Sequence, residues 1–110
     1  MARYMIQATY NVDARKALVA HPQDRVAGVA ALMERLGGRL ESFYFSMGEF
    51  DIVAIAELPD DIAAVTGALA VTGAGHLTAY QTTKLLTNEE MMTAMTKAHG
   101  LTYAAPSGSQ

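Results

Sequence analysis

Two apolar-rich runs, Arg39 to Met47 and Phe50 to Leu58, are separated by only two residues, Gly48-Glu49. Glycine in the first central position of a two-residue connection is typical of a type II′ β-hairpin. Such a turn fixes the register of the strands, because side chains alternate between the two faces of a sheet. One predicted face is apolar and pairs Met47 with Phe50, Phe45 with Ile52 and Phe43 with Ala54. The other face is mixed and pairs Ser46 with Asp51, Tyr44 with Val53 and Ser42 with Ile55.

Two further segments are expected to be strands. Strict alternation of side-chain character predicts a strand over Tyr4 to Tyr10, and a Thr-rich run predicts another over His76 to Leu86. Residues 11–21 are irregular and are expected to form a loop or a short turn of helix.

Helices are predicted between these strands. Apolar residues at helical spacing predict a helix from Pro22 to Leu36, with proline in the first position, where its missing N–H is not needed. A second helix is expected from Pro59-Asp60-Asp61 to Gly73, with an inner stripe of Ile62, Val65 and Leu69. The capping box Thr87-Asn88-Glu89-Glu90 predicts a third helix that ends near Ala98.

The predicted order is β-α-β-β-α-β with an added helix, which is the pattern of the ferredoxin-like α+β fold. This fold places both main helices on one face of a four-stranded antiparallel sheet and leaves the other face bare. The bare face would carry Tyr44, Val53 and Ile55 among polar side chains, and an apolar patch of this kind marks an interface or a ligand site. We therefore expect a homodimer or a higher homo-oligomer whose facing sheets enclose a semi-polar cavity.

Composition limits the remaining possibilities. The chain has 110 residues, which is the size of one domain, and its 51% hydrophobic content exceeds what one small core needs. It contains no cysteine, which excludes disulfides and thiolate chemistry. A net charge of −3 and the absence of any basic run argue against a nucleic-acid partner. No apolar stretch approaches ~18 residues and no signal-peptide core is present, so we expect no membrane association and a cytoplasmic location. Residues 1–103 are expected to form the domain, and residues 104–110 a disordered tail.

The chain resembles the GYD-domain family, which is named for a Gly-Tyr-Asp signature in this hairpin. The matching residues are Tyr10, Pro22, Arg25, Leu36-Gly37-Gly38, Ser42-Phe43-Tyr44, Gly48-Glu49-Phe50-Asp51-Ile52-Val53, Pro59-Asp60-Asp61 and Thr87-Asn88-Glu89-Glu90. The resemblance implies a ferredoxin-like fold of the dimeric α/β-barrel type and brings no general activity with it. Phe50 stands where the signature usually has tyrosine, so any role that needs that hydroxyl is absent here.

Asp51 is the most informative acidic residue. By alternation it points to the mixed face, with Ser46 opposite and Tyr44 diagonal to it, where a carboxylate could orient a ligand or act as a base. Alternatively, Asp51 accepts hydrogen bonds from turn N–H groups and holds the hairpin. The candidate ligand-binding residues on this face are Tyr44, Asp51, Ser46, Ser42, Gln7 and Thr9.

Other polar residues give weaker indications. The three histidines, His21, His76 and His99, show neither HxH nor HExxH spacing, so no metal site and no cofactor are predicted. Arg25 falls in the first turn of a predicted helix, where a cation opposes the helix dipole. It either stands near a bound anion or makes a surface or inter-subunit ion pair.

Three functions remain open. The leading hypothesis is an oligomeric module that binds a small organic ligand. The second is a cofactor-independent monooxygenase- or isomerase-like enzyme of the dimeric α/β-barrel type, with Tyr44, Asp51 and His76 as polar residues of its site, and it rests on fold analogy. The third is a structural subunit whose apolar face serves assembly.

Overall fold

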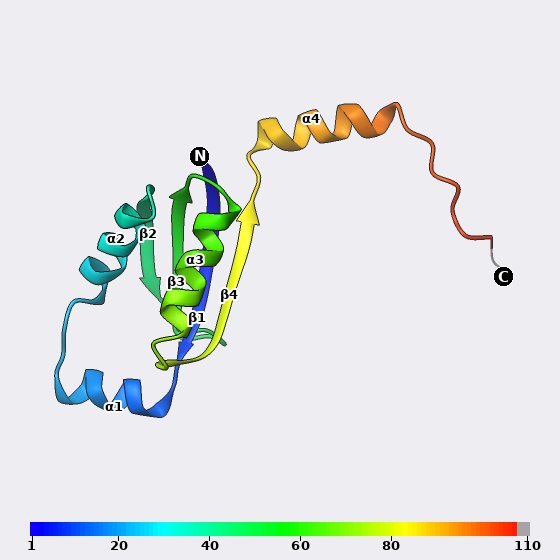
Figure 1. The fold of residues 1–110 in the computed structure, drawn as a ribbon. Coiled ribbons are helices and arrows are strands. Elements are labelled where there is room, and N and C mark those ends of the chain that lie inside the picture. The colour runs from blue at the N-terminus through cyan, green and yellow to red at the C-terminus, as the bar shows by residue number, and fades with distance from the viewer. Residues whose placement is uncertain (108–110) are drawn as a thin grey trace.

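The computed structural model describes residues 1–107. The strands pair antiparallel in the order β2-β3-β1-β4, and helices α2 and α3 cover one face of the sheet (Figure 1). This arrangement is the predicted ferredoxin-like α+β fold with an added C-terminal helix. The elements in chain order are β1 (Ala2–Tyr10), α1 (Val12–Ala20), α2 (Arg25–Arg35), β2 (Arg39–Phe45), β3 (Ile52–Leu58), α3 (Asp61–Thr72), β4 (Leu77–Leu85) and α4 (Asn88–His99).

The hairpin between β2 and β3 confirms the predicted register but not the predicted turn. The observed pairs include Phe45 with Ile52, Phe43 with Ala54, Tyr44 with Val53 and Ser42 with Ile55. The strands stop short of Gly48, so residues 46–51 form the connection and Met47 and Phe50 lie outside the ladder. Among the described residues, only Gly37 and Gly75 are glycines with positive φ, which excludes the type II′ turn expected at Gly48.

Helix α3 turns a different face to the sheet from the one predicted. Its largest apolar side chains, expected as the inner stripe, are exposed: 74% for Ile62, 56% for Val65 and 68% for Leu69. The buried residues are the small Ala64 and Gly67. A Cβ atom on Gly67 would lie 2.9 Å from Cδ1 of Leu36, so a side chain at this contact would require the end of Leu36 to move. The prediction was wrong because it ranked residues by hydrophobicity, whereas close packing on the sheet selects small ones.

The first half of the chain holds one more helix than predicted. Helix α1 occupies most of the segment expected as a loop or short turn, and its N-cap Asn11 accepts a hydrogen bond from the Ala14 N–H at 2.9 Å. Only Ala14 is buried in this helix, which explains the lack of apolar periodicity. Helix α2 begins at Arg25 after its N-cap Asp24, so Pro22 lies in the preceding connection and not in the first helical position.

The core lies between the inner face of the sheet and the two covering helices. It consists of Tyr4, Ile6, Ala8, Met33, Ile52, Ala54, Ala56, Leu58 and Ala64. The Tyr4 ring is buried, and its hydroxyl donates a hydrogen bond to Asp61 Oδ1 at 2.5 Å. Lys84 Nζ lies 3.1 Å from the same oxygen, so β1 and β4 both hold the first residue of α3. Burial and the hydrogen bond to Asp61 raise the pKa of Tyr4 to about 12.

Helix α4 projects away from the sheet (Figure 1). The capping box is confirmed, since Thr87 Oγ1 accepts from the Glu90 N–H and Glu90 accepts from the Thr87 N–H. No residue of α4 is buried. The radius of gyration is 18.3 Å, against roughly 13 Å for a compact domain of about this length. Of the predicted tail, residues 104–107 have no regular secondary structure, and residues 108–110 lie outside the described part of the chain.

Two glycines provide a test of this packing. At Gly38 a Cβ atom would lie 1.9 Å from the Glu57 carbonyl oxygen, so Gly38→Ala must displace backbone and should lower the free energy of unfolding by more than about 2 kcal/mol. At Gly48 the nearest atom to an added Cβ is Ser46 Oγ at 3.4 Å, and Gly48→Ala should change stability by less than about 0.5 kcal/mol. Urea unfolding followed by circular dichroism measures both. Equal losses in the two variants would contradict the described backbone.

Candidate functional site

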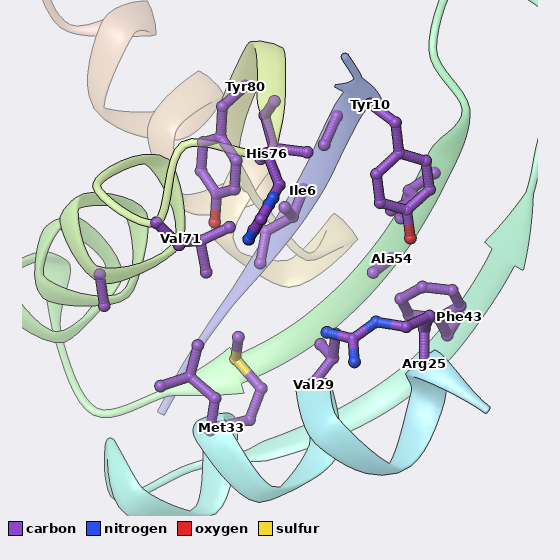
Figure 2. A pocket seen from close by; sticks show the side chains of 16 residues that line it. Ile6, Tyr10, Arg25, Val29, Met33, Phe43, Ala54, Val71, His76 and Tyr80 are labelled. Carbon is purple, nitrogen blue, oxygen red and sulfur yellow. The ribbon is translucent and has the colours of Figure 1, made fainter. Parts of the chain in front are cut away.

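A cavity of about 340 Å³ lies between the inner face of the sheet and helices α2 and α3 (Figure 2). Its walls are mainly apolar. Strands contribute Ile6, Ala8, Phe43, Ile52, Ala54 and Leu77, and the helices and the turn after α3 contribute Val29, Leu32, Met33, Ala70, Val71 and Ala74. Ligand pockets usually measure roughly 300–1,000 Å³, so this cavity could hold a small organic molecule.

The cavity exists because the inner face of α3 is built from small side chains. Ala70, Val71 and Ala74 face it from the end of α3 and the following turn. Leu69, which would have occupied such a space, points to solvent instead. Helix α3 turns a different face to the sheet from the predicted stripe of Ile62, Val65 and Leu69, and this orientation also leaves the volume open.

Four side chains bring polar groups to the cavity. Tyr10 comes from the end of β1, Arg25 from the start of α2, His76 from the residue before β4, and Tyr80 from within β4. In Figure 2 the guanidinium of Arg25 and the imidazole of His76 point inward from opposite sides. Burial raises the pKa of Tyr80, and burial also raises that of Tyr10, although the nearby Arg25 guanidinium opposes the rise. Both phenols are therefore neutral near pH 7 and available as hydrogen-bond donors.

The six predicted ligand-binding residues do not line this cavity. Gln7, Ser42 and Tyr44 are on the open face of the sheet, where Val53 pairs with both Gln7 and Tyr44 and so places those two side chains in one row. The other three lie at the hairpin end. Thr9 Oγ1 donates to the Glu49 carbonyl at 3.2 Å, and Ser46 Oγ accepts from the Gly48 N–H at 3.1 Å.

Asp51 has protein partners for its carboxylate. Oδ2 accepts from the Tyr10 N–H at 2.9 Å and lies 3.1 Å from Arg15 Nη2. The Tyr10 N–H is the main cause that lowers the pKa of Asp51, and Arg15 adds to the effect. These contacts join the hairpin to the end of β1 and to α1. They favour the interpretation that Asp51 holds the hairpin in place. Its partner is the Tyr10 N–H, which is more distant in sequence than the turn N–H groups that were expected.

Three of these four polar residues were not predicted to contact a bound ligand. Tyr10 and Tyr80 had no predicted role at a site, and His76 had only a catalytic one. The alternation that directs Tyr4, Ile6 and Ala8 inward also directs Tyr10 inward, so this residue could have been found. His76 entered only the enzyme hypothesis. Tyr80 lies in a Thr-rich strand whose apolar pattern is weak, and the sequence offers no signal for its position.

The strand order and the helices on one face define a ferredoxin-like α+β domain. The GYD domain matches residues 4–95, and the chain belongs to the GYD-domain family. No curated protein matches the sequence.

Solved structures resemble this chain. MtbAldR superimposes with a TM-score of 0.59 at 16% identity, over 79% of this chain and 54% of that one, so this chain spans about half the length of that protein. A mutant of MhuD, crystallised with two manganese protoporphyrin IX molecules per active site, matches with a TM-score of 0.44 at 17% identity, over 80% of this chain and 95% of that one. At these identities the likeness concerns the fold alone.

Residues 1–107 contain neither a metal-binding cluster nor a helix suited to span a membrane. No group of three His, Asp or Glu side chains in this part of the chain could hold a metal ion. None of its helices is long and apolar enough to cross a membrane.

The role of Asp51 can be tested by Asp51→Asn. The amide keeps the shape but loses the charge, so the free energy of unfolding should fall by about 1 kcal/mol at pH 7, as expected for a lost charge-assisted hydrogen bond. Because the pKa of Asp51 is lowered in the folded protein, its contribution is complete above the ordinary aspartate pKa of about 3.9 and is lost as the pH falls through the lowered value. The variant should therefore lose less stability than the parent on acidification below about pH 4.

Glu49→Gln in the same connection is the matched control, because the Glu49 side chain is exposed. Urea unfolding at several pH values compares the three proteins. Unchanged stability of Asp51→Asn would remove the structural assignment and return Asp51 to the candidate ligand contacts.

Proposed function

We propose that this GYD-domain protein is an oligomeric module that binds a small organic molecule in the cavity between the sheet and helices α2 and α3. The observation that supports this is the 340 Å³ apolar volume with polar groups of Tyr10, Arg25, His76 and Tyr80 at its edges. An apolar pocket with a few convergent polar groups is the usual form of a ligand site. The apolar walls supply affinity, and the polar groups orient the ligand.

A neutral dye tests whether the cavity binds an apolar molecule, independently of any charge on the ligand. N-phenyl-1-naphthylamine fluoresces strongly in apolar surroundings, and its emission should rise on addition of the protein. Val29→Trp places a large ring in the cavity and should weaken dye binding at least about tenfold. Fluorescence titration measures the dissociation constant for each protein.

Ala31→Trp is the control, because Ala31 lies on the exposed side of the same helix. It should bind the dye as the parent does, and circular dichroism should show that both variants are folded. No binding to the parent, or equal binding to parent and Val29→Trp, would refute the cavity as a ligand site.

The oligomeric part of the proposal rests on apolar surface that one chain leaves uncovered. The open face of the sheet carries Met5, Val53 and Ile55, with Tyr44 67% exposed beside them. Covering this face with a second copy would remove it from water, which is favourable. The predicted contacts Gln7, Ser42 and Tyr44 belong to this surface and stay candidates for polar contacts within the assembled protein.

Light scattering tests the assembly. The parent should give a mass of at least about twice 11.7 kDa at micromolar concentration. Val53→Lys places a charge in the open face and should lower the mass toward 11.7 kDa, whereas Ala31→Lys on the exposed side of α2 should leave it unchanged. A parent mass of 11.7 kDa would refute the homo-oligomer.

A further inference from the structure

Arg25 is a half-buried cation without a carboxylate partner in residues 1–107. Most other cations of the sheet and its surroundings lie within 4 Å of an acidic side chain, as Arg3 does with Glu41 and Arg39 with Glu57. Within residues 1–107 the neighbours of Arg25 are uncharged: Gln23 Oε1 accepts from Nη1 at the long distance of 3.5 Å, and the Tyr10 hydroxyl lies near enough that the guanidinium opposes the rise in the pKa of that phenol. No carboxylate in the described part of the chain therefore neutralises this charge, although the residue is partly withdrawn from water.

The position of Arg25 directs this charge to the cavity. The side chain folds back along α2 across Gly28, where an added Cβ atom would lie 3.6 Å from Nη1. Figure 2 shows the guanidinium pointing inward beside Val29 and Phe43. As the first residue of α2, Arg25 also lies at the positive end of the helix dipole, which makes an unpaired cation there less favourable. A bound anion would remove both costs.

We propose that the ligand of the cavity is an organic carboxylate with an apolar body, such as a medium-chain or arylalkyl acid; this inference rests on the proposed binding function. The carboxylate binds the Arg25 guanidinium, which matches its planar geometry with two parallel hydrogen bonds. The neutral Tyr10 hydroxyl is a further donor at the same end. The apolar body lies against Val29, Met33 and Ile52, which line the cavity below.

The test compares octanoate with 1-octanol, which have the same chain and differ in charge. Isothermal titration calorimetry should show that the parent binds octanoate at least about tenfold more tightly than 1-octanol, as expected for a charge-assisted hydrogen bond. Arg25→Gln should lose that preference while its affinity for 1-octanol stays within about twofold. Arg25→Lys keeps a charge without the planar fork and should retain part of the preference.

Arg35→Gln is the matched control, because Arg35 is an exposed residue in the last turn of the same helix, and its binding should equal that of the parent. Equal affinity of the parent for the two probes, or an unchanged preference in Arg25→Gln, overturns the carboxylate proposal while binding of 1-octanol or of the neutral dye upholds the cavity as a ligand site. If the parent binds neither probe nor the dye, the binding function fails and this proposal fails with it.

Discussion

Helix α3 can lie close to the sheet because the residues it buries there are small. Ala64 and Gly67 are buried, and the tip of Leu36 occupies the space that a side chain on Gly67 would need. The Tyr4 hydroxyl and Lys84 hold Asp61 at the start of the same helix. These contacts place α3 on the core, and further along the helix its small residues leave the cavity unfilled. The site thus depends on which face of one helix meets the sheet.

Much of the fold could be predicted from the sequence. The alternating pattern of β1, the two apolar runs of the hairpin and the capping box of α4 are local signals, and the structure confirms the strand pairing and the helix start that they indicate. The face that α3 turns to the sheet could not be predicted in this way. Every face of this helix contains apolar residues, so the inner face is decided by the distance to the sheet, and that distance is a property of the assembled domain.

The connection at Gly48 and the cavity site also could not be predicted from local sequence patterns alone. Gly48 fitted a tight turn by residue type, but the observed connection spans residues 46–51 and leaves its φ negative or extended. The sequence already placed Arg25 in the first turn of a predicted helix, where a cation opposes the helix dipole. A bound anion was one of the two explanations considered for this placement. The cavity that gives this observation meaning was not visible, because an unfilled volume depends on the spacing of elements and not on any local pattern.

The cavity joins residues that are far apart in the chain. Ile6 and Tyr10 come from the first strand, Arg25 from the first covering helix, and His76 and Tyr80 from the last strand and its approach. No part of the chain can form the site before β4 has taken its place beside β1. A molecule that fits the cavity would therefore bind the completed domain and not its fragments, and mass action would make the folded sheet and covering helices more resistant to unfolding as its concentration rises. Helix α4, which contributes nothing to the cavity, would gain no such protection.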